Sequence, residues 1–424
     1  MSSSQLSSPP SSTQRTYDLI LWGATGFTGR LVADYLFKVW QNKKSFRWAI
    51  AARNIDKLQC IQQTWQQIDP QAIEIPLLQA QLDHASSLVT LTQQCKVLCT
   101  TVGPYALYGT PIIQACIQTH THYCDLTGET QWIRQIIDQY HEQAQTHQIR
   151  LVHACGYDSI PSDLGTYMIQ KAMYQHYECY ASHVQLITGA TRGQMSGGTI
   201  ASMIQVVDSA QDRKVARILV HPYALSPDPN THGPDRRDSM RVKYNQAFKS
   251  WTSFFIMSSI NTRIVRRSHA LQQLCYGHEF SYQEGMGWGK GYKAMIRAYI
   301  FTLMLGLFMW LISHKWSRVL LQKYILPKPG QGPSEKQINR GYFTMHLHAQ
   351  HADKQLTAHV AHTLDPGYGS TALMLAESAL CLALDEAKLA KRYGCLTPAS
   401  AMGDVLIERL RQAGMQWDVN TIKK

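Results

Sequence analysis

The sequence contains no C-x-x-C pair among its ten cysteines. Cys99, Cys124 and Cys155 lie in apolar runs typical of buried strands, where a thiol behaves as a small hydrophobic side chain. This pattern argues against a disulfide framework and predicts reduced thiols in a cytoplasmic protein. Residues 1–16 also lack the apolar core of a signal peptide, and their Ser- and Pro-rich composition predicts a disordered tail.

Acidic residues are scarce in one part of the chain. The formal net charge is +12, and residues 236–328 hold 15 Lys and Arg but only 3 Asp and Glu. The rest of the chain is therefore balanced, and the excess positive charge belongs to this basic segment. The sequence has no recognisable nucleic-acid module with interleaved aromatic and basic residues, so we expect no nucleic-acid partner.

Apolar residues, by contrast, are abundant enough for a large core. The chain has 424 residues, of which 45% are hydrophobic, and this length predicts two domains. In the first 165 residues short apolar runs alternate with amphipathic stretches. This alternation predicts a doubly wound α/β fold with a parallel sheet, a Rossmann domain over 17–165. The predicted strands are 17–22, 47–52, 72–78, 97–102, 122–126 and 150–154.

A glycine-rich turn follows the first predicted strand. Gly23, Gly26 and Gly29 form a G-x-x-G-x-x-G pattern that opens the next helix. Gly23 allows a sharp turn, Gly26 lets the backbone approach a pyrophosphate, and Gly29 lets the helix pack against the sheet. The pattern predicts a dinucleotide-binding loop at a helix N-terminus, with a ligand-free turn as the alternative. The predicted loop also includes Thr25, Phe27 and Thr28.

The end of the second predicted strand distinguishes NAD from NADP. An NAD site places a carboxylate there for the ribose hydroxyls, whereas an NADP site needs a cation for the 2′-phosphate. This sequence has Arg53 at that point and no carboxylate until Asp56. We therefore predict NADP as the cofactor, with Arg53 at the 2′-phosphate. An arginine of a solvated loop is the alternative.

The carboxyl ends of the later strands predict the rest of the site, because in a doubly wound sheet they line one crevice. Tyr105, Asp125 and Asp158 each follow a predicted strand and are the candidate catalytic residues. A carboxyl or hydroxyl group there could orient a substrate or donate a proton after hydride addition. The structural alternatives are packing for Tyr105, a helix cap for Asp125 and a turn for Asp158. The residues predicted to face the cofactor here are Thr101, Val102, Gly103 and Pro104.

The second half of the chain predicts an α+β domain with a mainly antiparallel sheet. Residues 341–350 and 355–363 alternate apolar and polar around a short polar turn, as a hairpin does. We assign 166–365 to this substrate or dimerisation domain and 366–424 to helices that pack back on the Rossmann domain; a homodimer stays open. Several histidines lie in the hairpin, but strand alternation explains them, so no metal site is predicted.

The basic segment includes two strongly apolar stretches. Residues 298–312 carry no charge and as a helix would be about 22 Å long, shorter than the ~30 Å core of a bilayer. Lys and Arg flank both ends, and Trp310 and Trp316 suit a membrane interface. We predict membrane-surface contact through 251–260 and 298–316, with the protein peripheral on the inner face of the membrane. A buried core helix with a solvated basic rim is the alternative.

Further motifs resemble those of a known family. Residues 101–110 (TVGPYALYGT), 124–129 (CDLTGE) and 155–165 (CGYDSIPSDLG) resemble the saccharopine dehydrogenase-like oxidoreductases, and within them the trans-acting enoyl reductases that act on lipid-linked products. The resemblance continues through 196–199 and 366–370. It implies NADPH-dependent reduction of a C=C or similar bond in a lipid-like small molecule. A saccharopine-type imine dehydrogenase and a non-catalytic NADP-binding protein of membranes or lipid droplets are the alternatives.

Overall fold

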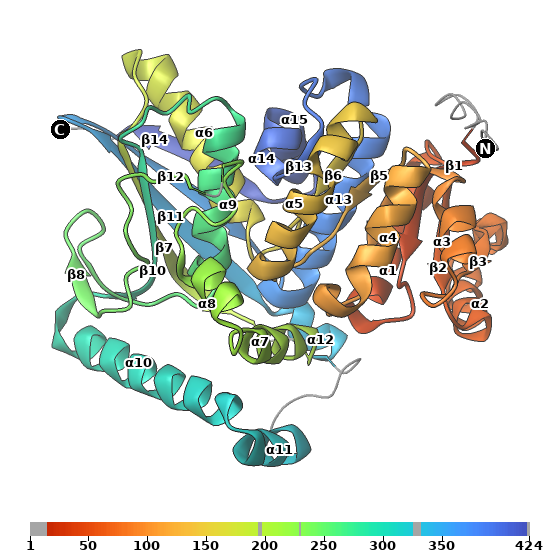
Figure 1. Ribbon diagram of the computed structural model, residues 1–424, viewed down its shortest axis with the longest axis horizontal. Coiled ribbons are helices and arrows are strands. Elements are labelled where there is room, and N and C mark those ends of the chain that lie inside the picture. Colours follow the sequence, from red (N-terminus) through yellow and green to blue (C-terminus); the bar gives the residue numbers. More distant parts are fainter. Residues whose placement is uncertain (1–14, 194–196, 229, 325–331, 422–424) are drawn as a thin grey trace, which may run out of the picture.

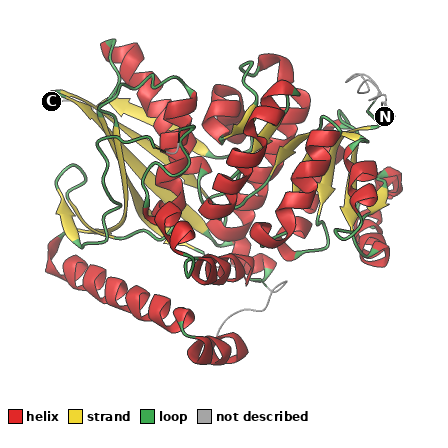
Figure 2. Cartoon of the chain, in the orientation of Figure 1, coloured by secondary structure: helices red, strands yellow, loops and turns green. Residues whose placement is uncertain are grey.

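The computed structural model of the protein describes residues 15–193, 197–228, 230–324 and 332–421. Two sheets of seven strands each form the body of the molecule, and helices cover them (Figure 1, Figure 2). This is the expected architecture, a Rossmann sheet with a second, mainly antiparallel sheet. Residues 1–14 of the predicted tail lie outside the described residues.

The first sheet is the predicted Rossmann sheet, and its neighbouring strands all run parallel. Its order is β13-β6-β5-β4-β1-β2-β3, with the reversal of strand order beside β1 that marks a doubly wound fold. Five of the six residues of β1 are buried, as expected for a strand covered on both faces. The strands are β1 (Tyr17–Trp22), β2 (Trp48–Ala52), β3 (Leu77–Gln79), β4 (Cys95–Thr100), β5 (His122–Cys124), β6 (Arg150–Val152) and β13 (Gly394–Leu396).

Hydrophobic side chains form a separate cluster on each face of this sheet. Leu19 and Leu21 belong to one cluster, and Ile20 and Trp22 belong to the other, because successive side chains of a strand point to opposite faces. The helices of this half are α1 (Phe27–Lys43), α2 (Ile55–Gln66), α3 (Ala85–Thr92), α4 (Tyr105–Gln118), α5 (Thr130–Thr146) and α6 (Ile160–Tyr177).

The third predicted strand, 72–78, is wrong in its bounds. Pro70–Glu74 forms a 3-10 helix, and β3 covers only Leu77–Gln79. The Asp69 carboxylate accepts a hydrogen bond from the N–H of Gln71 (3.0 Å), which caps this short helix. A capped turn therefore takes up apolar residues that the sequence pattern placed in a strand.

The second sheet has the order β14-β12-β11-β7-β10-β9-β8 and is antiparallel except between β7 and β10. The predicted hairpin is confirmed as β11 and β12, in which His346 lies opposite His359. Within the described ranges no three His, Cys, Asp or Glu side chains are grouped to hold a metal ion. The strands are β7 (His183–Arg192), β8 (Lys243–Asn245), β9 (Ser250–Ser253), β10 (Ser281–Gly289), β11 (Tyr342–His351), β12 (Lys354–His362) and β14 (Gln416–Thr421).

The last part of the chain contributes strands as well as helices. β13 extends the Rossmann sheet beside β6, and β14 pairs with β12 at the edge of the second sheet. The sequence predicted only helices over 366–424, so both strands are additions. The helices are α13 (Thr371–Leu384), α14 (Pro398–Ala401) and α15 (Gly403–Gln412), with a π-helical turn at Pro366–Ser370 and a 3-10 turn at Glu386–Lys388.

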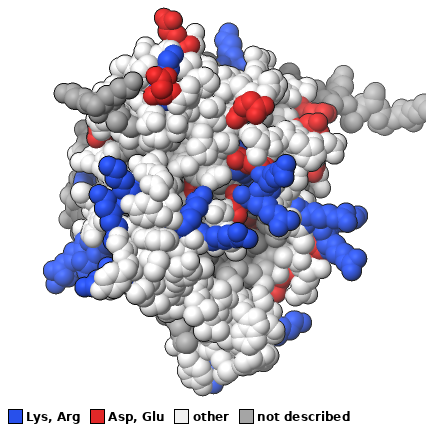
Figure 3. Space-filling model, turned by 90° about the vertical axis from the view of Figure 1, so that its left-hand side faces the viewer, with Lys and Arg blue, Asp and Glu red and all other residues white. Residues whose placement is uncertain are grey.

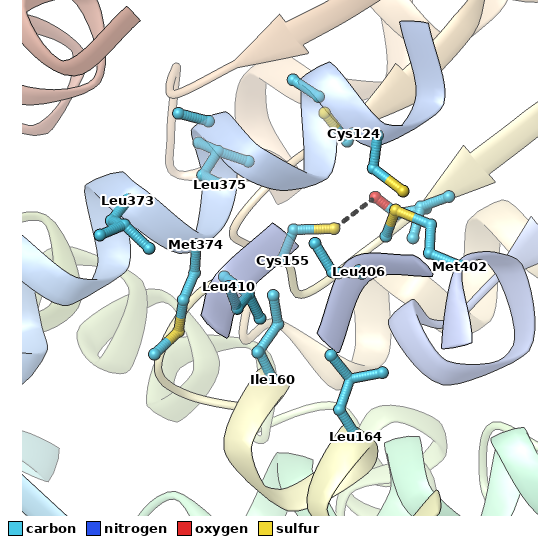
Figure 4. Close-up of a cluster of buried hydrophobic side chains, with 14 of the residues drawn as sticks. Cys124, Cys155, Ile160, Leu164, Leu373, Met374, Leu375, Met402, Leu406 and Leu410 are labelled. Atoms are coloured by element: carbon cyan, nitrogen blue, oxygen red, sulfur yellow. Dashed lines mark hydrogen bonds between the residues drawn. The ribbon is translucent and has the colours of Figure 1, made fainter. Parts of the chain in front are cut away.

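Helix α13 belongs to the hydrophobic core on one face of the Rossmann sheet, where it contacts α1, β1 and β4. Figure 4 shows Met374 and Leu375 of α13 gathered with Leu406 and Leu410 of α15 around Cys155. The Cys155 thiol lies 3.7 Å from the carbonyl oxygen of Val152, to which it donates. All ten cysteines of the chain are free, and seven of them are buried.

Three arginines of the basic segment lie inside the protein. Arg263, Arg266 and Arg267 belong to α9 (Ser258–Leu271), and none is more than 3% exposed. Arg266 Nε lies 2.8 Å from Asp235 Oδ2, and Arg267 donates to two backbone carbonyls. These three cations therefore pair inside the protein, whereas Lys290, Lys293 and Arg297 of the same segment are exposed. The other helices here are α7 (Gly197–Ser209), α8 (Arg213–Val220), α10 (Gly291–Ser313), α11 (Lys315–Tyr324) and α12 (Glu335–Asn339).

Helices α10 and α11 project along the lower edge of the molecule in Figure 1. α10 has 23 residues and is therefore about 34 Å long, longer than the uncharged stretch alone. Only Ala294, Ala298 and Ile312 of α10 are buried. The alternative of a buried core helix is therefore wrong for this segment.

Candidate functional site

A cavity of about 900 Å³ lies between the first turn of α1 and the inner face of α10. Its volume is near the upper end of the range for ligand sites, about 300–1,000 Å³. The glycine turn and the residues beyond β4 and β5 form one end, which is where doubly wound folds bind dinucleotides. Apolar side chains from α7, α10 and the chain before α9 form the other end. The cavity therefore has a polar end and an apolar end.

The geometry of the glycine turn fits a dinucleotide. Gly23 has a φ of +95°, and a side chain there would meet Val102 Cγ2 at 2.7 Å. A side chain at Gly29 would overlap the carbonyl oxygen of Gly23. Gly26 is exposed towards the cavity, and α1 begins at Phe27 with no side-chain cap and no acidic residue in its first turn. The first amide groups of α1 are open to an anion, as a pyrophosphate requires.

Most of the other predicted cofactor residues also reach this cavity. The Thr101 hydroxyl donates to the carbonyl oxygen of Gly23 (3.3 Å), so the chain beyond β4 supports the glycine turn. Val102 and Thr25 lie at the turn but do not line the cavity. The predicted residues that do line it are Gly26, Phe27, Thr28, Gly29, Thr101, Gly103 and Pro104.

Arg53 lies just beyond β2, with its side chain exposed. Its backbone carbonyl accepts a hydrogen bond from Gln79 Nε2 (2.9 Å). Asn54 caps α2, because its Oδ1 accepts from the N–H of Lys57 (3.0 Å). The guanidinium of Arg53 makes no ion pair within the described part of the chain, so it is available to a phosphate. Its role at the 2′-phosphate stays a prediction.

Asp158 lies on the wall of the cavity, between β6 and α6. Its side chain is partly buried, and burial alone raises the pKa of its carboxyl to about 6. A carboxyl with this pKa can both lose and regain a proton near neutral pH, as a general acid must.

Tyr105 is placed differently, although its ring also reaches the cavity. Its hydroxyl donates to the carbonyl oxygen of Thr100 (3.1 Å), and its ring centroid lies 5.6 Å from that of Trp132. Burial raises the pKa of the Tyr105 phenol well above its usual range. Its proton is therefore already engaged, and the contacts favour a packing role.

Asp125 is fully buried and is not among the residues that line the cavity. Its carboxylate accepts hydrogen bonds from the Tyr123 hydroxyl (2.9 Å) and from the N–H groups of Thr127 and Ala154 (3.1 Å each). Nδ1 of His153 lies 2.8 Å from Asp125 Oδ2. The carboxylate thus joins the ends of β5 and β6, and these contacts favour a structural role.

Glu129, which was not among the residues predicted from the sequence, links the two halves of the site. It is fully buried, and its carboxylate accepts from the N–H groups of Tyr105 (2.8 Å) and Ala106 (2.9 Å), so it caps α4. The hydroxyl of Ser202 on α7 also donates to it (3.0 Å). Its partners lie 23, 24 and 73 residues away in sequence, so no local pattern reveals this role.

The apolar end of the cavity includes part of 251–260, a stretch predicted from its sequence to contact the membrane. Phe255 is only 5% exposed, and Thr252, Ser253, Ser258 and Ile260 are also buried, whereas Ser259 is exposed. The predicted membrane contact through 251–260 is therefore wrong, because this stretch forms a cavity wall. The residues of 251–260 that line the cavity are Phe254, Ile256, Met257, Ser259 and Ile260.

Relatives of this chain share nearly its full length. The saccharopine dehydrogenase NADP-binding domain family matches residues 19–152, which include the glycine turn. A protein of Mycobacterium tuberculosis is 38% identical over 416 residues, covering 95% of this chain and 97% of its own length. Trans-acting enoyl reductases of Mycobacterium bovis and Mycobacterium ulcerans are each 36% identical, covering 96% of this chain and 98% of their own.

Among solved structures, apo saccharopine dehydrogenase (L-Glu forming) from Saccharomyces cerevisiae matches with a TM-score of 0.53. It covers 96% of this chain and 99% of its own, at 10% sequence identity, so this likeness shows the fold alone. The sequence relatives show the family. The chain is an NADP-dependent oxidoreductase that belongs to the saccharopine dehydrogenase-like family, in the group of the trans-acting enoyl reductases.

Proposed function

We propose that the protein uses NADPH to reduce the C=C bond of an enoyl group in a lipid-like substrate at a membrane surface. The observation that carries this proposal is that one cavity contains both the glycine turn with Asp158 and an apolar wall that ends on α10. A reactive polar end with an apolar extension suits an acyl group whose first carbons react and whose remaining carbons do not.

The residues at the polar end supply binding and proton chemistry. When bound, NADPH supplies the hydride that adds to the electron-poor carbon of the C=C bond. The open amides of α1 would hold the pyrophosphate, and Arg53 would pair with the 2′-phosphate. The carboxyl of Asp158 would donate a proton to the neighbouring carbon, and solvent would restore that proton.

The lining of the cavity argues against the amino-acid dehydrogenase alternative. A substrate such as saccharopine carries several carboxylates, which need cations in the site. No Lys or Arg is among the described residues that line this cavity. The apolar lining instead favours an uncharged acyl chain.

The outer face of α10 supports the membrane part of the proposal. Leu303 is 76% exposed, and Met304, Leu307 and Trp310 are each more than half exposed, a stripe much larger than the scattered apolar residues of ordinary surfaces. Figure 3 shows Lys and Arg in a band above a lower part of the molecule that carries few charges, and α10 and α11 form the lowest part in Figure 1. An exposed apolar helix next to a band of Lys and Arg is suited to binding an anionic lipid surface. We therefore place the protein on the cytoplasmic face of a membrane.

Oxidation of NADPH in the presence of an enoyl thioester tests the activity. The purified protein, with vesicles of phosphatidylcholine and phosphatidylglycerol, is expected to convert crotonyl- or hexadecenoyl-CoA to the saturated thioester, identified by mass spectrometry. Asp158→Asn is expected to lower kcat about 10²–10⁴-fold while NADPH binding, followed by fluorescence, is retained. The wild-type kcat is expected to fall as the pH rises through about 6, because Asp158 then loses its proton.

Two controls complete the experiment. Asp353→Asn changes an exposed acid in the turn of the distant β11–β12 hairpin and is expected to leave kcat unchanged. Arg53→Ala is expected to weaken NADPH binding at least about tenfold without changing NADH binding. If the wild type binds NADPH but reduces neither thioester, the non-catalytic alternative replaces the reductase.

A further inference from the structure

On one side, helix α10 alone forms the wall between the apolar end of the cavity and the exterior. α10 presents one stripe of residues to the cavity and a second stripe, with the same i, i+3, i+4, i+7 spacing, to the exterior. The cavity stripe consists of Thr302, Leu305, Gly306 and Met309. The exterior stripe consists of Ile300, Leu303, Met304 and Leu307, which are 53%, 76%, 64% and 55% exposed.

The chemistry of this end suits an alkyl chain. Val206 and Val207 of α7 and Leu219 of α8 form further parts of its wall. The hydroxyl of Thr302 donates to the carbonyl oxygen of Ala298 (2.8 Å) and is satisfied within its own helix. Among the described residues, α7, α8 and α10 place no charged side chain on the cavity wall. A polar ligand would lose hydration here without gaining partners, whereas an alkyl chain would lose only unfavourable contact with water.

Gly306 lies where the two stripes of α10 meet. It lines the cavity and is nevertheless exposed, and Trp310, one turn further on, is 51% exposed. A Cβ atom at Gly306 would have no neighbouring atom within 4 Å, and its φ is not positive. Glycine inside a helix costs roughly 0.5–1 kcal/mol relative to alanine, and neither packing nor backbone conformation requires it here. At Gly306 the wall that α10 forms therefore carries no side chain.

We infer that the apolar end of the cavity holds the acyl chain of the substrate, and that the chain enters from the lipid layer beside Gly306. The inference rests on the proposed function and adds the path of the substrate and the residue that sets its accepted length. The enoyl carbons lie near Asp158, and the remaining carbons run between α7 and α10 to Gly306. Substrate then passes sideways from the lipid layer that the outer stripe of α10 contacts.

Two variants that add the same side chain to different faces of α10 test this path. Gly306→Phe puts a ring at the opening, whereas Leu303→Phe keeps a large apolar side chain on the outer face. For Gly306→Phe the ratio of kcat/KM for hexadecenoyl-CoA to that for crotonyl-CoA is expected to fall at least tenfold. For Leu303→Phe this ratio is expected to stay within twofold of the wild type. An unchanged ratio in Gly306→Phe, with normal thermal unfolding and vesicle binding, would overturn the inference.

A binding measurement separates this inference from the proposed function. cis-Parinaric acid, a fatty acid whose fluorescence rises in apolar surroundings, reports occupation of the channel without turnover. Gly306→Phe is expected to weaken its binding at least tenfold, and Leu303→Phe is expected to leave it unchanged. If no thioester is reduced but this difference appears, the proposed function fails and the channel stands. If thioesters are reduced and both variants bind the probe as the wild type does, the function stands and the channel fails.

Discussion

Two helical stretches of this chain have similar apolar character but opposite surroundings. Within the described residues, Gly291–Ser313 and Pro366–Leu384 are both long and apolar enough to cross a membrane. In the most apolar part of the first, 11% of the residues are buried, against 83% in the second. Hydropathy therefore shows that both helices are strongly apolar, but it does not distinguish a helix buried in the protein core from one on the protein surface.

The residues of the two helices explain the difference. α13 is rich in Leu and Ala, and the small Ala side chains allow close contact with α1, α15 and three strands of the Rossmann sheet. Its one charged side chain, Glu377, is paired inside the protein with Arg409 (2.7 Å). α10 instead carries large Phe, Met, Tyr and Trp side chains and keeps its cations, Lys293 and Arg297, in its exposed N-terminal half. The core helix α13 thus has small residues and a paired charge. The surface helix α10 has exposed cations in its N-terminal half, followed by large apolar residues.

The largest expected difference between the two helices appears when one leucine in each is replaced by aspartate. Leu375→Asp in α13 buries an unpaired carboxylate at a position that is 0% exposed. We expect the free energy of unfolding to fall by more than about 4 kcal/mol, so that no folded protein is obtained. Leu303→Asp on the outer face of α10 is expected to change the free energy of unfolding by less than about 0.5 kcal/mol while it weakens vesicle binding. Denaturant unfolding and co-sedimentation with vesicles measure both. Equal destabilisation would mean that the outer face of α10 is covered, for example by a second copy of the chain.

The cations next to the apolar stripe give the second largest expected effect. Lys290, Lys293 and Arg297 are exposed at the start of α10, and a basic residue near an anionic lipid surface contributes about 1 kcal/mol. Changing all three to Gln is therefore expected to weaken binding to vesicles with phosphatidylglycerol about 100-fold, and binding to pure phosphatidylcholine much less. The control is Lys43→Gln with Lys44→Gln, two exposed lysines at the end of α1. A similar loss in this control would show that total charge, not this face, governs binding.

The sequence predicted the features of this protein that depend on local patterns. The glycine turn and its flanking strand and helix follow from residues that are adjacent in the chain, so Gly23, Gly26 and Gly29 could be assigned without a structure. The carboxyl ends of parallel strands share one edge by topology, which placed Asp158 on the cavity wall.

Features decided by distant partners could not be predicted. β13 has three residues and is a strand only because β6 lies beside it. Arg266 has the sequence context of a surface residue, but Asp235 and two carbonyl groups satisfy it in the interior. For the same reason 251–260 and 298–312 have similar sequence character, yet one faces the cavity and the other largely faces outwards.

The charge pair of α13 gives a smaller effect than the core leucine. Glu377→Gln leaves one acceptor for the Tyr35 hydroxyl (2.7 Å in the wild type) but removes the ionic partner of Arg409, which keeps Asp385 (2.8 Å). We expect a loss of about 1–3 kcal/mol in the free energy of unfolding, measured in urea. Arg297→Gln in α10 is the matched change of an exposed charge that makes no ion pair with the described residues, and it is expected to have no measurable effect on unfolding. A comparable loss for Arg297→Gln would show that α10 also relies on internal pairing.

The smallest expected effects differ in sign between the two helices. Gly306→Ala in α10 adds a Cβ atom into open space and is expected to stabilise the helix by about 0.5–1 kcal/mol, seen as slower amide exchange over 291–313. Ala379→Gly in α13, at a position that is 0% exposed, removes a packed methyl group and is expected to destabilise the protein by about 1 kcal/mol or more. Opposite signs would show that the glycine of α10 is kept against its structural cost, which an opening for substrate explains. If Gly306→Ala makes amide exchange faster instead, the glycine is needed for close packing of α10 on its surroundings. Its presence would then be no argument for an opening at this position.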